Sequence, residues 1–136
     1  MDNAAFKLDT YHFVKASLNF DVSDDSLLSI NIVPSGVYKQ NLGLFVLSFN
    51  VNVSVADSSI DVVNVLCQAQ FSFMDPIPAS EIPDFFYPNS LAIIFPYIRA
   101  FVSTLTLQAN VRPIVLPTVN LMGLTDMLRK ETTVEE

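Results

Sequence analysis

The sequence contains few of the residues that build metal centres, disulfide frameworks and phosphate loops. Its 136 residues include one cysteine, one histidine and three glycines, and no tryptophan. A single cysteine cannot form an internal disulfide, which argues against a disulfide-stapled secreted domain. Three glycines leave little room for a backbone cradle around phosphate groups, and no dinucleotide or zinc-binding spacing is found. We therefore expect no cofactor, no metal and no enzymatic activity.

Positive charge is also scarce. Seven Lys and Arg residues stand against 14 Asp and Glu, a net charge of -7, so the basic face that nucleic acid requires is not expected. Residues 1–9 lack the basic start and apolar run of a signal peptide. The uncharged stretches 40–56 and 85–98 are broken by polar residues or prolines, so neither resembles a membrane span of roughly 20 apolar residues. We expect a cytoplasmic protein without membrane insertion.

Apolar residues, by contrast, are abundant. They make up 51% of the chain, against 15% charged residues, with a mean hydropathy of +0.42. The length suits one domain over residues 1–136. A domain of this size leaves part of such apolar content on its surface, so we expect apolar partners.

The first two thirds of the chain alternate apolar and polar residues, as half-buried strands do. This pattern predicts strands over 6–20, 27–33, 44–56 and 60–73, with a break at Pro34-Ser35-Gly36. In the first strand it places six residues on one face: Phe6, Leu8, Val14, Ala16, Leu18 and Phe20. Short turns between successive strands favour an antiparallel meander.

The rest of the chain changes character at Met74. Residues 74–89 hold four prolines and the run Phe85-Phe86-Tyr87, which predicts a long extended loop. A long helix capped by Asn89 or Ser90 should follow to about residue 110, and a short helix capped by Asn120 should precede an acidic tail at 130–136. The predicted fold class is α+β: a four-stranded antiparallel meander sheet with a long crossover loop, one long helix and one short C-terminal helix.

The long helix is apolar on nearly every side, although a sheet can cover only one side. A second subunit is the simplest cover for the remainder, so we expect a homo-oligomer. The residues expected at its interface are Ile94, Ile98, Phe101, Val102 and Leu105.

Three features suggest chemistry, and each has a plainer explanation. His12 lies in a predicted strand and is more easily a tolerated sheet residue than a base or a ligand. Cys67 is in phase with the apolar face, as a buried core thiol would be. The pair Asp24-Asp25 suits a solvated bend better than a metal site.

The aromatic run in the predicted loop is a different kind of candidate. Phe85-Phe86-Tyr87 either fills part of the core or forms an aromatic groove for extended polypeptide.

Several short motifs resemble the SecB family of protein-export chaperones. They are Leu66-Cys67, Tyr87-Pro88-Asn89, Phe95-Pro96-Tyr97-Ile98-Arg99 and residues 113–120. The resemblance implies a dimer of dimers that holds unfolded preproteins in hydrophobic grooves without nucleotide and passes them to the translocase motor SecA. It also implies a groove, although each member could instead be plain core: Leu66, Phe71, Phe73, Phe85, Phe86, Tyr87 and Phe95.

The chain also departs from the family pattern. Gln68 stands where the family has a glutamate that serves motor docking, and the first strand offers Lys15 and Asn19 where further acids are expected. Loss of a charge removes an electrostatic contribution to association. The residues thus support the chaperone scaffold better than the export partnership. An alternative is a SecB-like chaperone dedicated to one client, as in toxin–antitoxin systems.

Overall fold

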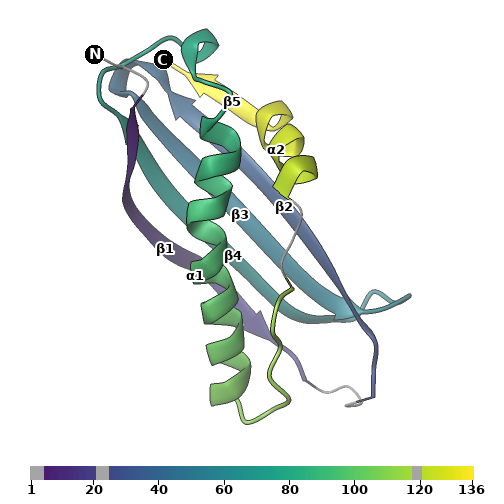
Figure 1. Ribbon diagram of the computed structural model, residues 1–136. Coiled ribbons are helices and arrows are strands. Elements are labelled where there is room, and N and C mark those ends of the chain that lie inside the picture. Colours follow the sequence, from purple (N-terminus) through teal and green to yellow (C-terminus); the bar gives the residue numbers. More distant parts are fainter. Residues whose placement is uncertain (1–4, 21–24, 118–120) are drawn as a thin grey trace.

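The computed structural model describes residues 5–20, 25–117 and 121–136, which form one sheet with two helices on one of its faces (Figure 1). This arrangement confirms the predicted α+β class. The single domain predicted for residues 1–136 remains a prediction. Two short 3₁₀ turns cover Gln40–Leu42 and Ala79–Glu81. The other elements are β1 (Phe6–Leu18), β2 (Leu28–Lys39), β3 (Leu44–Val55), β4 (Asp61–Phe73), α1 (Phe86–Gln108), α2 (Leu121–Lys130) and β5 (Thr132–Glu135).

The strand order is β1-β4-β3-β2-β5. Strands β2, β3 and β4 form the expected antiparallel meander, but β1 pairs with β4, from Phe6 opposite Phe73 to Leu18 opposite Val63. The prediction of a simple four-stranded meander is wrong on this point. Alternation shows which side chains face the core but not which strands are neighbours, so the pattern could not place β1.

Most of the acidic tail predicted at 130–136 is strand β5, which was not predicted. Thr132 to Glu135 pair in parallel with Gly36 to Lys39 of β2, which makes the sheet five-stranded and mixed. The β-branched residues Thr132, Thr133 and Val134 suit a strand. The prediction relied on the three glutamates of this segment and overlooked the strand preference of its β-branched residues.

Strand β2 continues through Pro34-Ser35-Gly36, where a break was predicted. The N–H of Gly36 donates to the Glu131 carbonyl (3.2 Å), so it points away from β3. Pro34, two residues earlier, faces the same way, and its missing N–H therefore costs β2 no hydrogen bond to β3. Gly36 is itself required here, because a Cβ atom at this position would lie 2.5 Å from Cζ of the buried Phe45.

The assignment of alternate β1 residues to the core face is wrong in the middle of the strand. Register shifts between Leu8 and Thr10 and between Phe13 and Lys15 insert extra residues. As a result, Tyr11 and Phe13 join the face that contacts α1, and Val14 is 50% exposed. Such bulges break a strict two-residue period, so alternation alone assigns side chains beyond them to the wrong face.

Helix α1 begins at Phe86, earlier than the predicted cap at Asn89 or Ser90. Pro88 is its third residue, where an N–H has no helical partner, so proline does not oppose the earlier start. Pro96 lies inside the helix on its exposed side, and Ala92, whose carbonyl loses a partner, is exposed too. Water can therefore satisfy that carbonyl. The predicted cap Asn120 lies outside the described residues.

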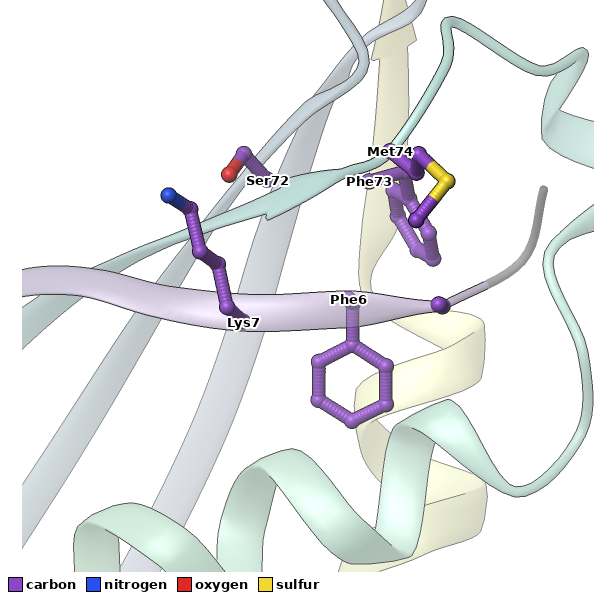
Figure 2. A pocket seen from close by; sticks show the side chains of 6 residues that line it. Phe6, Lys7, Ser72, Phe73 and Met74 are labelled. Carbon is purple, nitrogen blue, oxygen red and sulfur yellow. The ribbon is translucent and has the colours of Figure 1, made fainter. Parts of the chain in front are cut away.

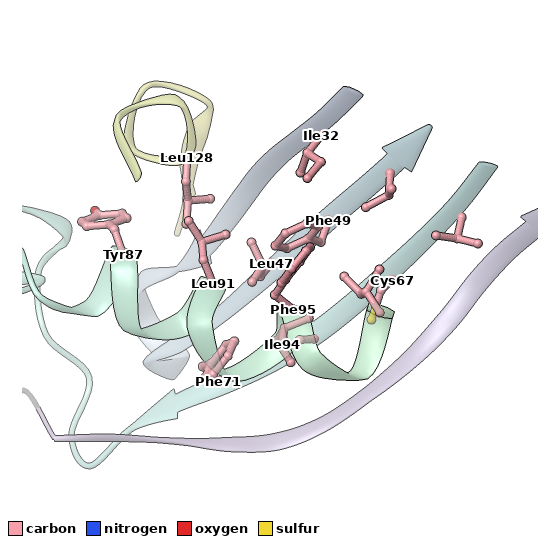
Figure 3. Packing of buried hydrophobic residues seen from close by; sticks show 14 of the residues in the cluster. Ile32, Leu47, Phe49, Cys67, Phe71, Tyr87, Leu91, Ile94, Phe95 and Leu128 are labelled. Carbon is pink, nitrogen blue, oxygen red and sulfur yellow. The ribbon is translucent and has the colours of Figure 1, made fainter. Parts of the chain in front are cut away.

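The core fills the space between the sheet and the two helices (Figure 3). Leu47 and Phe49 of β3 face Leu91 and Ile94 of α1, and Leu128 of α2 closes one side. In the described part of the chain, α1 is the one helix long and apolar enough to cross a membrane by length and composition. Its buried face packs on the sheet, as the core helix of a packed domain does.

Candidate polypeptide-binding surface

Aromatic rings gather at the end of the sheet where β1 begins and β4 ends. The ring of Phe86, the first residue of α1, lies 4.8 Å from that of Phe6, 5.7 Å from Phe71 and 5.1 Å from Phe73. Phe71 and Phe86 are fully buried. Edge-to-face pairs at these distances add to the stabilisation from burial. The cluster thus anchors the start of α1 to the sheet.

This cluster opens to solvent at its outer edge. Phe85 stacks on Phe6 with ring centroids 6.4 Å apart but remains 47% exposed, and Met74 is 59% exposed. A hollow of about 470 Å³ lies beside Met74 and Phe6 (Figure 2) and is lined by Ala5, Phe6, Lys7, Ser72, Phe73 and Met74. We call Phe6, Phe73, Met74 and Phe85 the aromatic opening.

The seven predicted groove residues fall into different environments. Phe73 and Phe85 belong to the aromatic opening, and Phe71, Phe86 and Tyr87 lie behind it in the core. Phe95 lies further along α1, where its ring stacks on Phe49 at 6.0 Å. Leu66 is out of phase with Cys67 and points to the sheet face that carries no helix. Polypeptide binding by any of them remains a prediction.

The crossover loop is pinned beside the aromatic cluster by two side chains from β2 and the turn after it. The Tyr38 hydroxyl donates to the Ile77 carbonyl at 2.6 Å. Burial raises the pKa of Tyr38, although the hydrogen bond to Ile77 opposes this rise. The Ala79 N–H donates to Oε1 of Gln40 at 2.7 Å. These bonds give the loop a fixed position without regular structure.

Tyr87 links the start of α1 to α2. The Arg129 guanidinium lies over its ring, 4.9 Å from the centroid, and also pairs with Asp84 at 3.4 Å. Burial raises the pKa of Tyr87; the positive charge of Arg129 works against this, and Asp84 adds to it. The contact holds α2 against the end of α1 that carries the aromatic opening.

Helix α1 buries one side and leaves the other exposed. Of the predicted interface residues, Ile94, Ile98 and Val102 are fully buried in the chain's own core. Phe101 is half-buried against Phe13 of β1, with ring centroids 3.9 Å apart, and Leu105 is also half-buried. The core itself therefore explains three of the five. The outward side of α1 instead presents Ile93 and Leu107, which are 38% and 62% exposed, and the edge of Tyr97, which is 42% exposed although its ring stacks on Tyr11 of β1 at 4.4 Å.

The sheet face without helices is a surface that the sequence reasoning largely missed. Its central strands carry uncharged polar side chains that bond across the sheet, Gln68 to Ser48 at 3.2 Å and Asn64 to Asn52 at 3.0 Å, and Asn52 also donates to the Asp61 carboxylate at 2.9 Å. The alternating Ser and Asn residues of 44–56 were the available signal. We call this surface the amide face.

The candidate chemical groups take ordinary positions. Cys67 is fully buried, as predicted, and burial raises its pKa to about 11. His12 is exposed on β1, opposite Gln68. Asp25 is exposed, and Asp24 lies outside the described residues. Within residues 5–20, 25–117 and 121–136, no cluster of His, Cys, Asp and Glu could hold a metal ion.

A family model described as preprotein translocase subunit SecB matches residues 21–131. A curated relative, an uncharacterized protein of Methanocaldococcus jannaschii, is 53% identical over 36 residues, which are 26% of this chain and 23% of the relative. The match thus spans about a quarter of that relative's length.

One solved structure has a similar fold. The SecB-like chaperone Rv1957 of Mycobacterium tuberculosis, in complex with a ChAD peptide from the HigA1 antitoxin, matches with a TM-score of 0.70 at 14% identity. The match covers 86% of this chain and 89% of that one. A Streptococcus agalactiae protein of unknown function covers 84% and 94% at 14% identity, but its TM-score of 0.35 is too low to support an argument.

Proposed function

Because the matching family model covers residues 21–131, this chain belongs to the SecB family, and we propose that it is a cytoplasmic, ATP-independent chaperone that holds unfolded polypeptides. Binding would occur at the aromatic opening and continue along the crossover loop. Membership of the family and the shared fold support the general chaperone role. The site and the clients are the proposal.

The observation that carries the proposal is the exposure of Met74, in the wall of the hollow, and of Phe85, which stacks on Phe6 in the same wall. An unfolded client presents apolar side chains along an extended backbone. Burial of apolar surface contributes about 25 cal/mol per Å² whatever the order of residues. A surface of this kind therefore binds many clients without sequence specificity, and it requires no nucleotide to do so.

The outward side of α1 supports an oligomer, which the family resemblance predicts to be a dimer of dimers. Ile93, Tyr97 and Leu107 form an apolar stripe at helical spacing. Native mass spectrometry should then give two or four times the 15.1 kDa of one chain. Leu107→Glu should shift the mass toward one chain, whereas Leu42→Glu, also at an exposed leucine but outside α1, should not. A single-chain mass for the unchanged protein would contradict the proposal.

A chaperone dedicated to one client is the second candidate. The complex of Rv1957 with an antitoxin peptide favours it, because that protein shares this fold. The amide face favours it too. Gln68, at the position of the family's docking glutamate, bonds to Ser48 and offers no charge to a motor. Pull-down with purified SecA separates the two candidates: capture would support export, and its absence would support the dedicated role.

The general proposal is tested by aggregation of a chemically denatured protein diluted into buffer without nucleotide. Light scattering should fall as this protein is added in stoichiometric amounts. The Phe85→Asp variant should suppress scattering less, since it places a charge in the aromatic opening. Unchanged scattering at a several-fold excess of the unaltered protein would refute the chaperone role.

A further inference from the structure

The C-terminal strand β5 is weakly attached to the sheet. It is four residues long and is the one strand in the described chain that pairs in parallel. Three of its four residues are exposed, including Val134 at 49%. Beyond the ladder, the Thr132 hydroxyl donates to the Leu128 carbonyl at 2.6 Å and Gln40 Nε2 donates to Glu136 Oε1 at 3.0 Å. Main-chain hydrogen bonds, which any extended chain can supply, therefore provide most of the attachment.

The strand that β5 joins has a much longer edge. β2 runs for 12 residues, and β5 pairs only with Gly36 to Lys39. Because the Gly36 N–H points outward to Glu131, Ile30 and Ile32 direct their main-chain groups to the same side. In the described part of the chain, residues 28–35 have no neighbouring strand on that side.

The open part of this edge is apolar. Ile30 is 37% exposed on the face that carries the helices, and Val33 is 40% exposed on the amide face. An extended segment along β2 would thus find main-chain partners together with apolar side chains on both of its faces. Free strand edges of this kind bind extended polypeptide readily.

We propose that the edge of β2 is a second client-binding surface, and that β5 occupies part of it until an extended apolar segment of the client displaces β5. A client strand could pair with β2 on both sides of Pro34, whose missing N–H removes one outward hydrogen bond, whereas β5 pairs with four residues. The inference rests on the proposed chaperone function, because it assigns a further surface to the same clients.

Displacement would also reach the crossover loop. Gln40 contacts Glu136 through its nitrogen and holds the Ala79 N–H through its oxygen. Departure of β5 removes the first contact and leaves the second. The edge of β2 and the loop beside the aromatic opening thus share one side chain, through which occupation of one surface can influence the other.

The test compares three forms of the full chain. The unchanged protein is compared with a variant lacking residues 132–136 and with Val37→Cys/Thr133→Cys, whose positions are paired across β2 and β5. Oxidation of that pair should fasten β5 in place, and the reduced pair is the matched control. The probe is fluorescently labelled, reduced and carboxymethylated α-lactalbumin, which stays unfolded.

Removal of β5 should lower the Kd for the probe by about tenfold, and the oxidised pair should raise it by about tenfold, since β5 and the client compete for one edge. Hydrogen exchange should show that the probe protects the amides of Ile30 and Ile32 and exposes those of Thr133 and Glu135, which face β2 in the parallel register. The oxidised pair keeps the test valid if the shortened chain folds poorly.

Equal Kd values for the oxidised and reduced pair, without protection of Ile30, would overturn the inference and leave the chaperone proposal intact. A fall in oligomer mass on removal of β5 would also overturn it, because β5 would then link copies of the chain. Failure of every form to bind the probe would refute the proposed function itself.

Discussion

Replacing Phe85 with alanine should separate client binding from folding. Phe85 and Phe86 are neighbours in the chain, but Phe85 is 47% exposed and Phe86 is fully buried. Phe86→Ala should destabilise the domain by about 3–5 kcal/mol, because it leaves a cavity among five aromatic rings. Phe85→Ala should cost about 1 kcal/mol, since it removes little more than the stack on Phe6.

The expected loss of client affinity follows from the exposed area. A phenylalanine side chain buries roughly 200 Å² when fully enclosed, and with 47% of Phe85 exposed, roughly 90 Å² is free for a client. At about 25 cal/mol per Å² this area contributes about 2 kcal/mol. Phe85→Ala should therefore raise the Kd for an unfolded client by about thirtyfold.

The measurement is fluorescence anisotropy with an unfolded, labelled client, and urea unfolding monitors stability in parallel. Ile60→Ala is the matched control. Ile60 is also an exposed apolar residue, 47% accessible like Phe85, but it lies at the opposite end of the sheet, just before β4 begins. A Kd for Phe85→Ala within twofold of the control value would refute the aromatic opening as the site.

Three further predictions concern the scaffold. Gly36→Ala should lower the free energy of unfolding by about 1–3 kcal/mol in urea, because the added methyl group collides with Phe45. Tyr38→Phe should lower it by about 1–2 kcal/mol and increase hydrogen exchange in the crossover loop, since Ile77 loses its partner. Cys67, with its pKa raised to about 11, should resist a thiol reagent at pH 8 until the chain unfolds. Its contribution to stability should be complete below pH 9 and lost as the pH rises toward 11, because the unfolded thiol ionises first.

Strands β3 and β4 could be predicted closely from the sequence. Their inward residues, from Phe45 to Val53 and from Val63 to Phe73, alternate without interruption, and the structure buries these two sets against the helices. In strands that pair in a regular antiparallel register, burial follows the two-residue period directly. Local pattern was therefore sufficient here.

Long-range pairing and irregular strands could not be predicted in this way. The position of β1 beside β4 depends on contacts between residues 45 to 67 positions apart, from Leu18 with Val63 to Phe6 with Phe73. β5 depends on an edge that exists only because β2 continues past Pro34. Both pairings depend on residues outside the paired segment, so the local pattern of β1 or β5 could not predict them.

The aromatic opening could be predicted only in part, because the exposure of its residues depends on packing between segments that are distant in the sequence. The sequence singled out Phe85-Phe86-Tyr87 as aromatic, but only the packing shows that Phe85 faces solvent while its two neighbours are buried. Leu66 was assigned to the groove through the family resemblance. It directly precedes Cys67 in a strand, however, and the two-residue period of that strand places neighbouring side chains on opposite faces. The period of β4 was the better guide at that residue.

The amide face has a consequence for how partners would be recognised. Its central hydrogen bonds join Gln68 to Ser48 and Asn64 to Asn52, which are neutral side chains. Added salt screens charges but has little effect on neutral dipoles. A protein that docks on this side should associate without long-range steering, and its binding should persist when the ionic strength is raised. Binding that persists at high ionic strength is therefore the result expected of a partner held by these central side chains.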